Sequence, residues 1–324
     1  MDAFIDFVRT CAVSLALTLA VRAQSPASEP ASVPPPAPLP SAPLAGELPA
    51  DASPEARQAW KALCAATAPE TAEGGVRPRV RAFDLVFDGT LQSGGTRSND
   101  FETRYRYLEP GFVRMSLASG RERLRGPRGD FVIESGRPVK VQGREMAEDL
   151  RELEETVAIA KCFAGLTDPR SLRLSSLELR PAAPRELPAA VGSRNPSALR
   201  WLSIVSPDLQ RSAPRAPPTS PTATGTPVPS SWRAHIGLDP TTHLPVLALV
   251  AQDDRGTLVL ETALLVELDK YRALDGFRVP AQIKTYLPDA ERSPWAFAER
   301  PAMKLWMVKG TLRPELSELD FVPR

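Results

Sequence analysis

The chain of 324 residues has few of the side chains that most often carry chemistry, with only three cysteines and two histidines. Its 40 Lys and Arg balance 39 Asp and Glu, so no overall basic charge favours nucleic acid as a partner. Beyond the first 23 residues, no apolar run approaches the roughly 18 residues that a membrane-spanning helix requires. These absences leave a soluble protein of one large or two ordinary domains, long enough to bury a full core.

Motifs of common enzymes are also missing. The sequence contains no Gly-x-Ser-x-Gly, no His-Glu-x-x-His and no glycine-rich phosphate loop. Glu152, Glu154 and Glu155 imitate paired catalytic carboxylates, but they fall on the polar side of an amphipathic helix, where solvation explains them better. We therefore expect no enzyme activity and no cofactor.

The two histidines, His235 and His243, flank Asp239 in "HIGLDPTTH". A hairpin could bring the three together as metal ligands, but no further imidazole or thiolate lies nearby in the sequence. Polar residues beside a turn are the favoured interpretation, and we expect no metal.

The first 23 residues are typical of a secretory signal, with an apolar stretch over 11–21 and a cleavage site after Ala23. Asp2 and Asp6 depart from the usual positive start. We expect export to the periplasm or another compartment outside the cytoplasm. After cleavage Cys64 and Cys162 remain, and the sequence leaves open one disulfide or two buried thiols.

Proline is abundant, at 35 residues, and is clustered. Residues 24–52 predict an extended Pro/Ala-rich linker, and about 207–231 predict a disordered insertion within the domain 53–324. The rest has the pattern of an α+β, mainly β protein. Ser53 and Pro54 predict the start of a short helix. Alternating runs from 81 to 140 and from 231 to 311 predict two antiparallel meanders, with long strands that suit a curved or barrel-like sheet.

One long helix is predicted between the meanders, over 144–165 in "REMAEDLRELEETVAIAKCFAG". An apolar stripe repeats at steps of three and four, and Gly165 is the expected stop. Ile159, Cys162 and Phe163 widen the apolar sector near the C-terminal end. The stripe comprises Met146, Leu150, Leu153, Val157, Ala160 and Ala164. Periodicity alone allows two interpretations: a helix that seals an ordinary core, or a helix over an apolar hollow.

Three segments in order resemble the LolA/LolB-like group of periplasmic lipoprotein carriers, over roughly 54–323. The first is "FDLVFDGTLQ…FETRYRYLEPGFVRMSL", which is similar to the opening hairpins of that group. The second runs from "WRAHIGLDPTTHLPVLALVAQ" to "GFRVPAQIKTYLP", with an Asp-ended strand, a turn, Leu-Pro and a Gly-x-x-Val-Pro phrase. The third, "MKLWMVKGTLRPELSELDFVP", is similar to the closing strand, short helix and Phe. The two Pro-rich segments are not part of that pattern.

The resemblance implies an unclosed β-barrel with a helical lid over an apolar cavity that takes lipoprotein acyl chains or other lipid. It implies a monomeric carrier, with a membrane-bound donor or acceptor protein as a further partner. An arginine on an early strand that hydrogen-bonds the lid is also implied, and Arg81, Arg104, Arg106 and Arg114 are the candidates. The expected lining of the cavity is Phe83, Leu85, Phe87, Tyr105 and Met115 on one wall, Leu258, Leu260 and Leu264 opposite, and Met146, Leu150, Leu153 and Val157 under the lid.

A non-lipid alternative to the carrier also remains. Seven arginines lie between Arg104 and Arg128, and they suit anionic headgroups, an acidic partner or simply a solvated sheet exterior, which is favoured. Arg104 and Arg106 alternate with Tyr105 and Tyr107 and so point away from the apolar face. The competing class is therefore a non-lipid interaction or scaffold domain with a filled core.

Overall fold

The computed structural model describes residues 47–68, 79–93, 97–109, 111–117, 119–142, 146–206, 231–254, 257–286, 288–289, 296–298 and 300–323. The expected signal, most of the linker and the Pro-rich insertion lie outside these residues. Residues 47–52 belong to the folded body, because Ala52 is buried and Leu48 packs on the same apolar cluster. The folded body therefore starts earlier than the expected boundary at residue 53.

Two α-helices carry the helical part of the described chain. The first, α2 (Pro54–Thr67), begins as expected, with the side chain of Ser53 accepting a hydrogen bond from the Ala56 amide. The second, α3 (Ala147–Thr167), is the long helix. Gly165 does not end it: a Cβ at Gly165 would lie 2.6 Å from Leu172 Cδ2, so this glycine lets the next segment pack against the helix.

The strands form two meanders, as the alternation predicted, with an additional strand β4 and a small extra hairpin. The N-terminal strands are β1 (Ala82–Ser93), β2 (Arg97–Leu108), β3 (Phe112–Leu117), β4 (Glu122–Gly126), β5 (Gly129–Glu134) and β6 (Arg137–Lys140). After α3 come β7 (Ser176–Arg180), β8 (Arg200–Val205), β9 (Ser231–Leu238), β10 (Pro245–Asp254), β11 (Thr257–Leu274), β12 (Phe277–Tyr286), β13 (Pro288–Asp289), β14 (Ala296–Phe297) and β15 (Met303–Thr311). Short 3-10 turns are η3 (Pro169–Ser171), η4 (Pro196–Ala198) and η6 (Glu318–Phe321).

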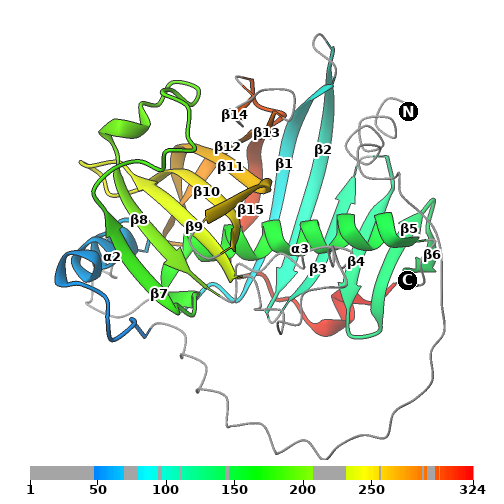
Figure 1. The fold of residues 1–324 in the computed structure, drawn as a ribbon. Helices are drawn as coiled ribbons and strands as arrows, with labels where there is room; N and C mark the ends of the chain where they lie inside the picture. Colours follow the sequence, from blue (N-terminus) through cyan, green and yellow to red (C-terminus); the bar gives the residue numbers. More distant parts are fainter. Residues whose placement is uncertain are drawn as a thin grey trace, which may run out of the picture.

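Thirteen of these strands form one antiparallel sheet in the order β6-β5-β4-β3-β2-β1-β15-β12-β11-β10-β9-β8-β7, and β13 pairs with β14 separately. The order begins at β6 and ends at β7, so the sheet is unclosed, as the sequence predicted (Figure 1). The last long strand, β15, lies in the middle, between β1 and β12, and joins the two meanders.

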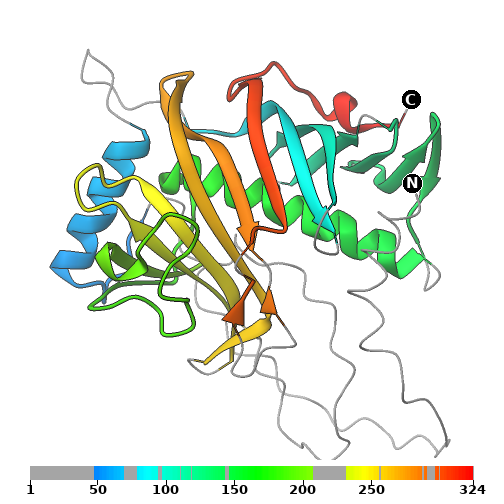
Figure 2. The ribbon, with the colours of Figure 1, turned by 90° about the horizontal axis from the view of Figure 1, so that it is seen from above.

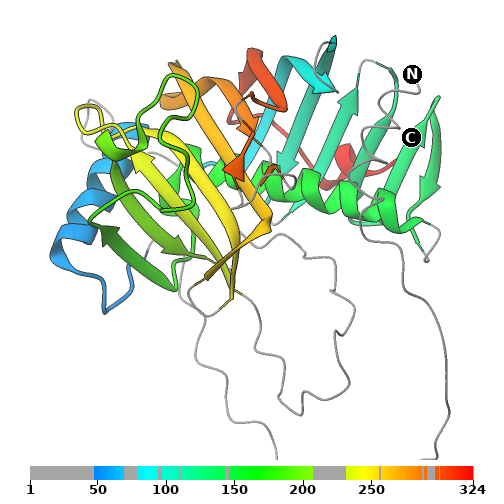
Figure 3. The same cartoon turned by 45° about the horizontal axis from the view of Figure 1, so that its top comes forward.

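The helix α3 connects the two edge strands of the sheet, since it follows β6 and precedes β7. Twelve strand spacings of about 4.8 Å give an arc of roughly 58 Å, whereas a helix of this length covers about 31 Å. The sheet therefore curves, which brings its two edge strands closer together than the length of the arc. Accordingly, α3 contacts β3, β4 and β5 at one end and β12 at the other (Figures 2 and 3).

Both helices cover the same face of the sheet, here called the inner face. Ile236, in the cluster under α2, pairs with Ala248, and the register continues through Val266 and Thr285 to Met303, which packs under α3. Residues opposite one another in paired strands point to the same side. The outer face carries its own apolar cluster over β8, β10 and β11, called the outer cluster, which includes Trp201 and Leu249.

Candidate functional site

The largest aromatic group on the inner face lies under α3 and is called the α3 cluster. It is built by β1, β2, β3, β12 and β15 together with the C-terminal half of the helix. All five residues expected on the sheet wall belong to it, and each is at most 9% exposed: Phe83, Leu85, Phe87, Tyr105 and Met115. Strand alternation placed them on one side, and the pairing of β1 with β2 and β2 with β3 brings them together.

Phe163 is the residue of α3 that enters this aromatic group most directly. Its ring lies edge-on to Phe83 at 5.3 Å and to Phe87 at 6.4 Å between ring centroids. Phe83 also stacks on Tyr107, and Phe87 meets Tyr105 edge-on. The sequence placed Phe163 beside the main stripe, and the structure makes it a principal contact of the helix with the sheet.

The stripe of α3 is buried unequally along its length. Val157, Ala160 and Ala164 belong to the α3 cluster, and Leu153 is fully buried. Leu150 is only half-buried, and Met146 is half-buried at the N-cap position, where no side chain caps the helix. The apolar C-terminal half of the helix therefore packs on aromatic side chains, whereas the N-terminal half lies over β3, β4 and β5 near the sheet edge.

The wall expected opposite is divided between the two faces. Val250 pairs with Leu264 and Gln252 with Val259, so the register advances two positions on β10 and five on β11. The two advances differ by three residues, an odd number. Side chains of β11 on the two sides of this irregularity therefore alternate in opposite phase. Leu264 lies beside Val250 of the α2-side cluster, whereas Leu258 packs in the outer cluster. The side chain of Leu260 lies outside the described residues.

A buried arginine on the inner face was missed by the sequence reasoning. Arg123 is 7% exposed and pairs with Met115 across β3 and β4. Burial raises the pKa of Tyr105 to about 12, and the charge of Arg123 partly offsets this effect. Strand β4 presents Leu124 to the outer side, where Phe321 covers it. The signal in the sequence was Phe321, a large apolar side chain in a polar C-terminal segment, which needs an apolar partner such as Leu124.

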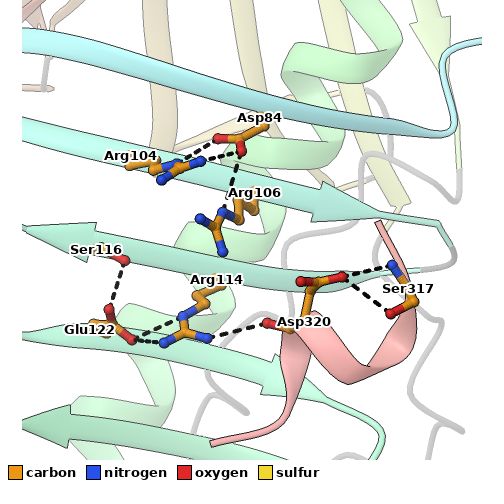
Figure 4. Close-up of polar contacts among 8 residues, drawn as sticks. All are labelled: Asp84, Arg104, Arg106, Arg114, Ser116, Glu122, Ser317 and Asp320. Atoms are coloured by element: carbon orange, nitrogen blue, oxygen red, sulfur yellow. Dashed lines mark hydrogen bonds and ion pairs between the residues drawn. The ribbon is translucent and has the colours of Figure 1, made fainter. Parts of the chain in front are cut away.

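None of the four arginines proposed to hold the lid has a described contact with α3. Arg104 and Arg106 bind Asp84, Arg114 binds Glu122 and the Asp320 carbonyl, and Arg81 lies 3.8 Å from Glu109. Figure 4 shows the contacts of Arg104, Arg106 and Arg114 on the outer face, with the strands between them and the helix. Carboxylates thus neutralise these exterior arginines.

Arg121 of the β3–β4 connection contacts α3 through an ion pair. It donates to Asp149 of α3 at 2.9 Å and lies 3.4 Å from Glu134. Both partners in the Arg121–Asp149 pair are about a quarter exposed, so the pair contributes only roughly 0.2–1 kcal/mol.

The C-terminal end of α3 is held more firmly. The carboxylate of Asp168, which is fully buried, accepts from the Val80 amide at 3.3 Å and from Arg170 Nε at 2.7 Å. Nearby, burial followed by the charge of Asp168 raises the pKa of the Cys64 thiol to about 12. The side chain of Cys162 lies outside the described residues, so a disulfide with Cys64 and two separate thiols both stay open.

The residues considered as metal ligands, His235, Asp239 and His243, do not form a metal site among the described residues. Asp239 accepts hydrogen bonds from Thr241 and Thr242 within its own turn, and the bonds from Thr242 lower its pKa. Within the described ranges, no group of three His, Cys, Asp or Glu side chains is placed to hold a metal ion. No helix among the described residues combines the length and apolar character needed to cross a membrane.

Comparison with known proteins gives matches only among solved structures. No family model matches the chain, and no curated protein matches it. The chain is similar to LolA superfamily protein NE2245 from Nitrosomonas europaea, at 11% identity and a TM-score of 0.40, over 82% of this chain and 97% of that one. It is also similar to an outer membrane lipoprotein-sorting protein domain from Vibrio parahaemolyticus, at 11% identity and 0.41, over 82% and 94%.

A DUF1329 family protein from Desulfovibrio piger matches at 12% identity and a TM-score of 0.40, over 82% of this chain and 97% of that one. These similarities concern the fold and leave the ligand to be argued from the site.

Proposed function

We propose that the chain is an exported carrier or binder of acyl chains, of a lipoprotein or another lipid, between the inner face of the sheet and α3. The observation that carries the proposal is the construction of the α3 cluster. Its sheet side is a continuous aromatic and aliphatic surface, and its cover is one helix that connects the two sheet edges. The names of the LolA superfamily and lipoprotein-sorting matches agree with this ligand class and with a periplasmic location.

The energies allow one acyl chain to replace the helix. Removing Val157, Ala160, Phe163 and Ala164 from the cluster costs on the order of 5–8 kcal/mol, from the usual values for burying such side chains. A chain of about 14 methylenes returns roughly 11 kcal/mol at about 0.8 kcal/mol each. In the closed form, the ring of Phe163 thus occupies the space against Phe83 and Phe87 that an acyl chain would enter.

The way α3 is attached suggests which end opens. Its N-terminal end has no side-chain cap and one described ion pair to the sheet, Arg121–Asp149, whereas its C-terminal end is fixed by the buried Asp168. Opening at the N-terminal end would withdraw Leu150 and Leu153 first and Phe163 last.

The second candidate is an interaction domain with a filled core. It is favoured by the direct contacts among the aromatic rings, which resemble an ordinary packed interior. In this interpretation α3 is permanent core, and the protein binds a partner elsewhere.

Mass spectrometry of organic extracts separates the two candidates. Protein expressed with its signal, matured at about residue 24 and purified without detergent, is extracted before and after incubation with phospholipid vesicles. Stoichiometric lipid or acylated peptide supports the carrier and identifies its cargo. Clean extracts from both samples contradict it and favour the filled core.

A further inference from the structure

A separate hollow lies on the outer face of β7–β9, where residues of the 181–199 connection pass over the sheet. Its volume is about 490 Å³, and its lining includes Arg180, Arg185, Arg233, His235 and Leu258. Volumes of roughly 300–1,000 Å³ are usual for sites that bind small molecules. This pocket is distinct from the α3 cluster, because the sheet separates the two.

Two residues that line the pocket, Glu178 and His235, belong to a polar row on three paired strands, with the buried Ser203 between them. Glu178 of β7 pairs with Ser203 of β8, and Ser203 pairs with His235 of β9. Their neighbours Leu177, Ile204 and Ala234 point to the inner face and pack under α2, so this row must point outward. Ser203 is fully buried and His235 is 2% exposed, and the Ser203 hydroxyl accepts from Arg233 Nη1 at 3.0 Å. The row is therefore rigid.

The charges in the pocket do not cancel. Arg185 lies 3.4 Å from Glu186, and Arg233 lies 3.8 Å from Glu178. Arg180 makes no ion pair with the part of the chain that the structure describes, and its Nε is buried without a hydrogen-bond partner. A guanidinium offers parallel N–H donors that match a carboxylate or a phosphate. Arg180 is thus the cation left for a ligand.

We propose that this outer pocket binds a small organic anion through its carboxylate or phosphate group. Arg180 provides the principal contact, with Arg185 and Arg233 at the sides and His235 at the floor. Ala183 and Leu258 give the pocket an apolar side, which suits an anionic group attached to a short hydrocarbon part. The inference goes beyond acyl-chain binding and does not depend on it.

Isothermal titration calorimetry of the mature protein tests the pocket, with inorganic phosphate and benzoate as separate probes at constant ionic strength. We expect one saturable site for at least one probe. Binding of phosphate alone identifies a phosphate ligand, and binding of benzoate alone identifies a carboxylate. Arg180→Gln should weaken binding about tenfold or more, as expected for the loss of charge-assisted hydrogen bonds.

Two further variants keep the test independent of folding. Arg185 is 85% exposed, so Arg185→Gln leaves the fold intact and should weaken binding severalfold. Arg200→Gln is the matched control. Arg200 lies two residues before Leu202 on β8, so it faces the inner side of the sheet, as Leu202 does. The Arg200→Gln variant should bind the probe with native affinity. Absence of saturable binding, or native affinity in both Arg180→Gln and Arg185→Gln, would overturn the proposal. Clean lipid extracts leave it unaffected.

Discussion

Gly192 holds the outer loop against a buried charge. Its φ is +57°, and a Cβ there would lie 2.4 Å from Glu267 Oε2 and 2.9 Å from the Tyr286 hydroxyl. Glu267 is fully buried and accepts from Lys284 Nζ at 3.0 Å and from the Tyr286 hydroxyl at 2.7 Å. The close approach of the backbone to this carboxylate requires glycine.

Gly192→Ala should therefore lower the free energy of unfolding by about 3 kcal/mol or more, because it strains the backbone and disturbs a buried ion pair. Gly136→Ala is the control, since Gly136 has a φ of +77° with nothing within 4 Å of its added Cβ. It should cost only about 1 kcal/mol. Urea denaturation measures both, and equal losses would show that the loop contact contributes nothing.

The thiol of Cys64 gives a pH-dependent prediction. Its pKa is raised by burial from 9.0 to about 12 in the folded chain, so between these values the unfolded chain loses a proton that the folded chain keeps. This group therefore makes stability fall as pH rises from about 9 to about 12.

At about pH 8 the folded protein should react slowly with a thiol reagent, and the denatured protein rapidly. The mature Cys162→Ser variant isolates Cys64 for this measurement. Rapid labelling of the folded variant would contradict the burial of Cys64. Native protein that shows no thiol after denaturation would instead show that Cys64 and Cys162 are bonded.

At the scale of the element, α3 decides between carrier and filled core. Leu150 lies on its half-buried N-terminal part, so Leu150→Glu should leave a folded protein. The same change places a charge where an acyl chain would enter, and lipid recovered in extracts should fall about tenfold or more.

Leu319→Glu is the matched control for this prediction, because Leu319 is 75% exposed. It should keep native lipid content. Circular dichroism of both variants completes the test. If Leu150→Glu unfolds while Leu319→Glu does not, α3 is a permanent part of the core. That result would contradict the proposal that α3 is a movable lid.

At the scale of the whole molecule, the sheet shows how the long insertion can be removed. Val205 of β8 and Arg233 of β9 pair in register, so the chain on the two sides of 207–230 is already adjacent. Replacing residues 207–230 by a short Gly/Ser turn should keep the fold and change the free energy of unfolding by about 1 kcal/mol or less. Thermal unfolding and lipid extraction check the prediction, and a collapsed or aggregated product would show that 207–230 supports the sheet.

The sequence by itself determined most of the elements and many of their inward residues. Ser53 and Pro54 start α2 because capping is chemistry between neighbours, and Phe83, Leu85 and Phe87 face one side because strands repeat every two residues. The order of segments resembles the LolA/LolB-like group, and that resemblance predicted an unclosed sheet crossed by a helix.

Only the tertiary structure decided the contacts made by distant parts of the chain. Leu258 faces outward because the β10–β11 register shifts. Arg123 faces inward because its neighbour Leu124 packs against Phe321 on the outer side of β4. Arg180 became a ligand candidate because the loop and three strands form a pocket around it. Each of these outcomes depends on which strands pair and on where an irregularity shifts their register, and the alternation within a single strand does not locate either.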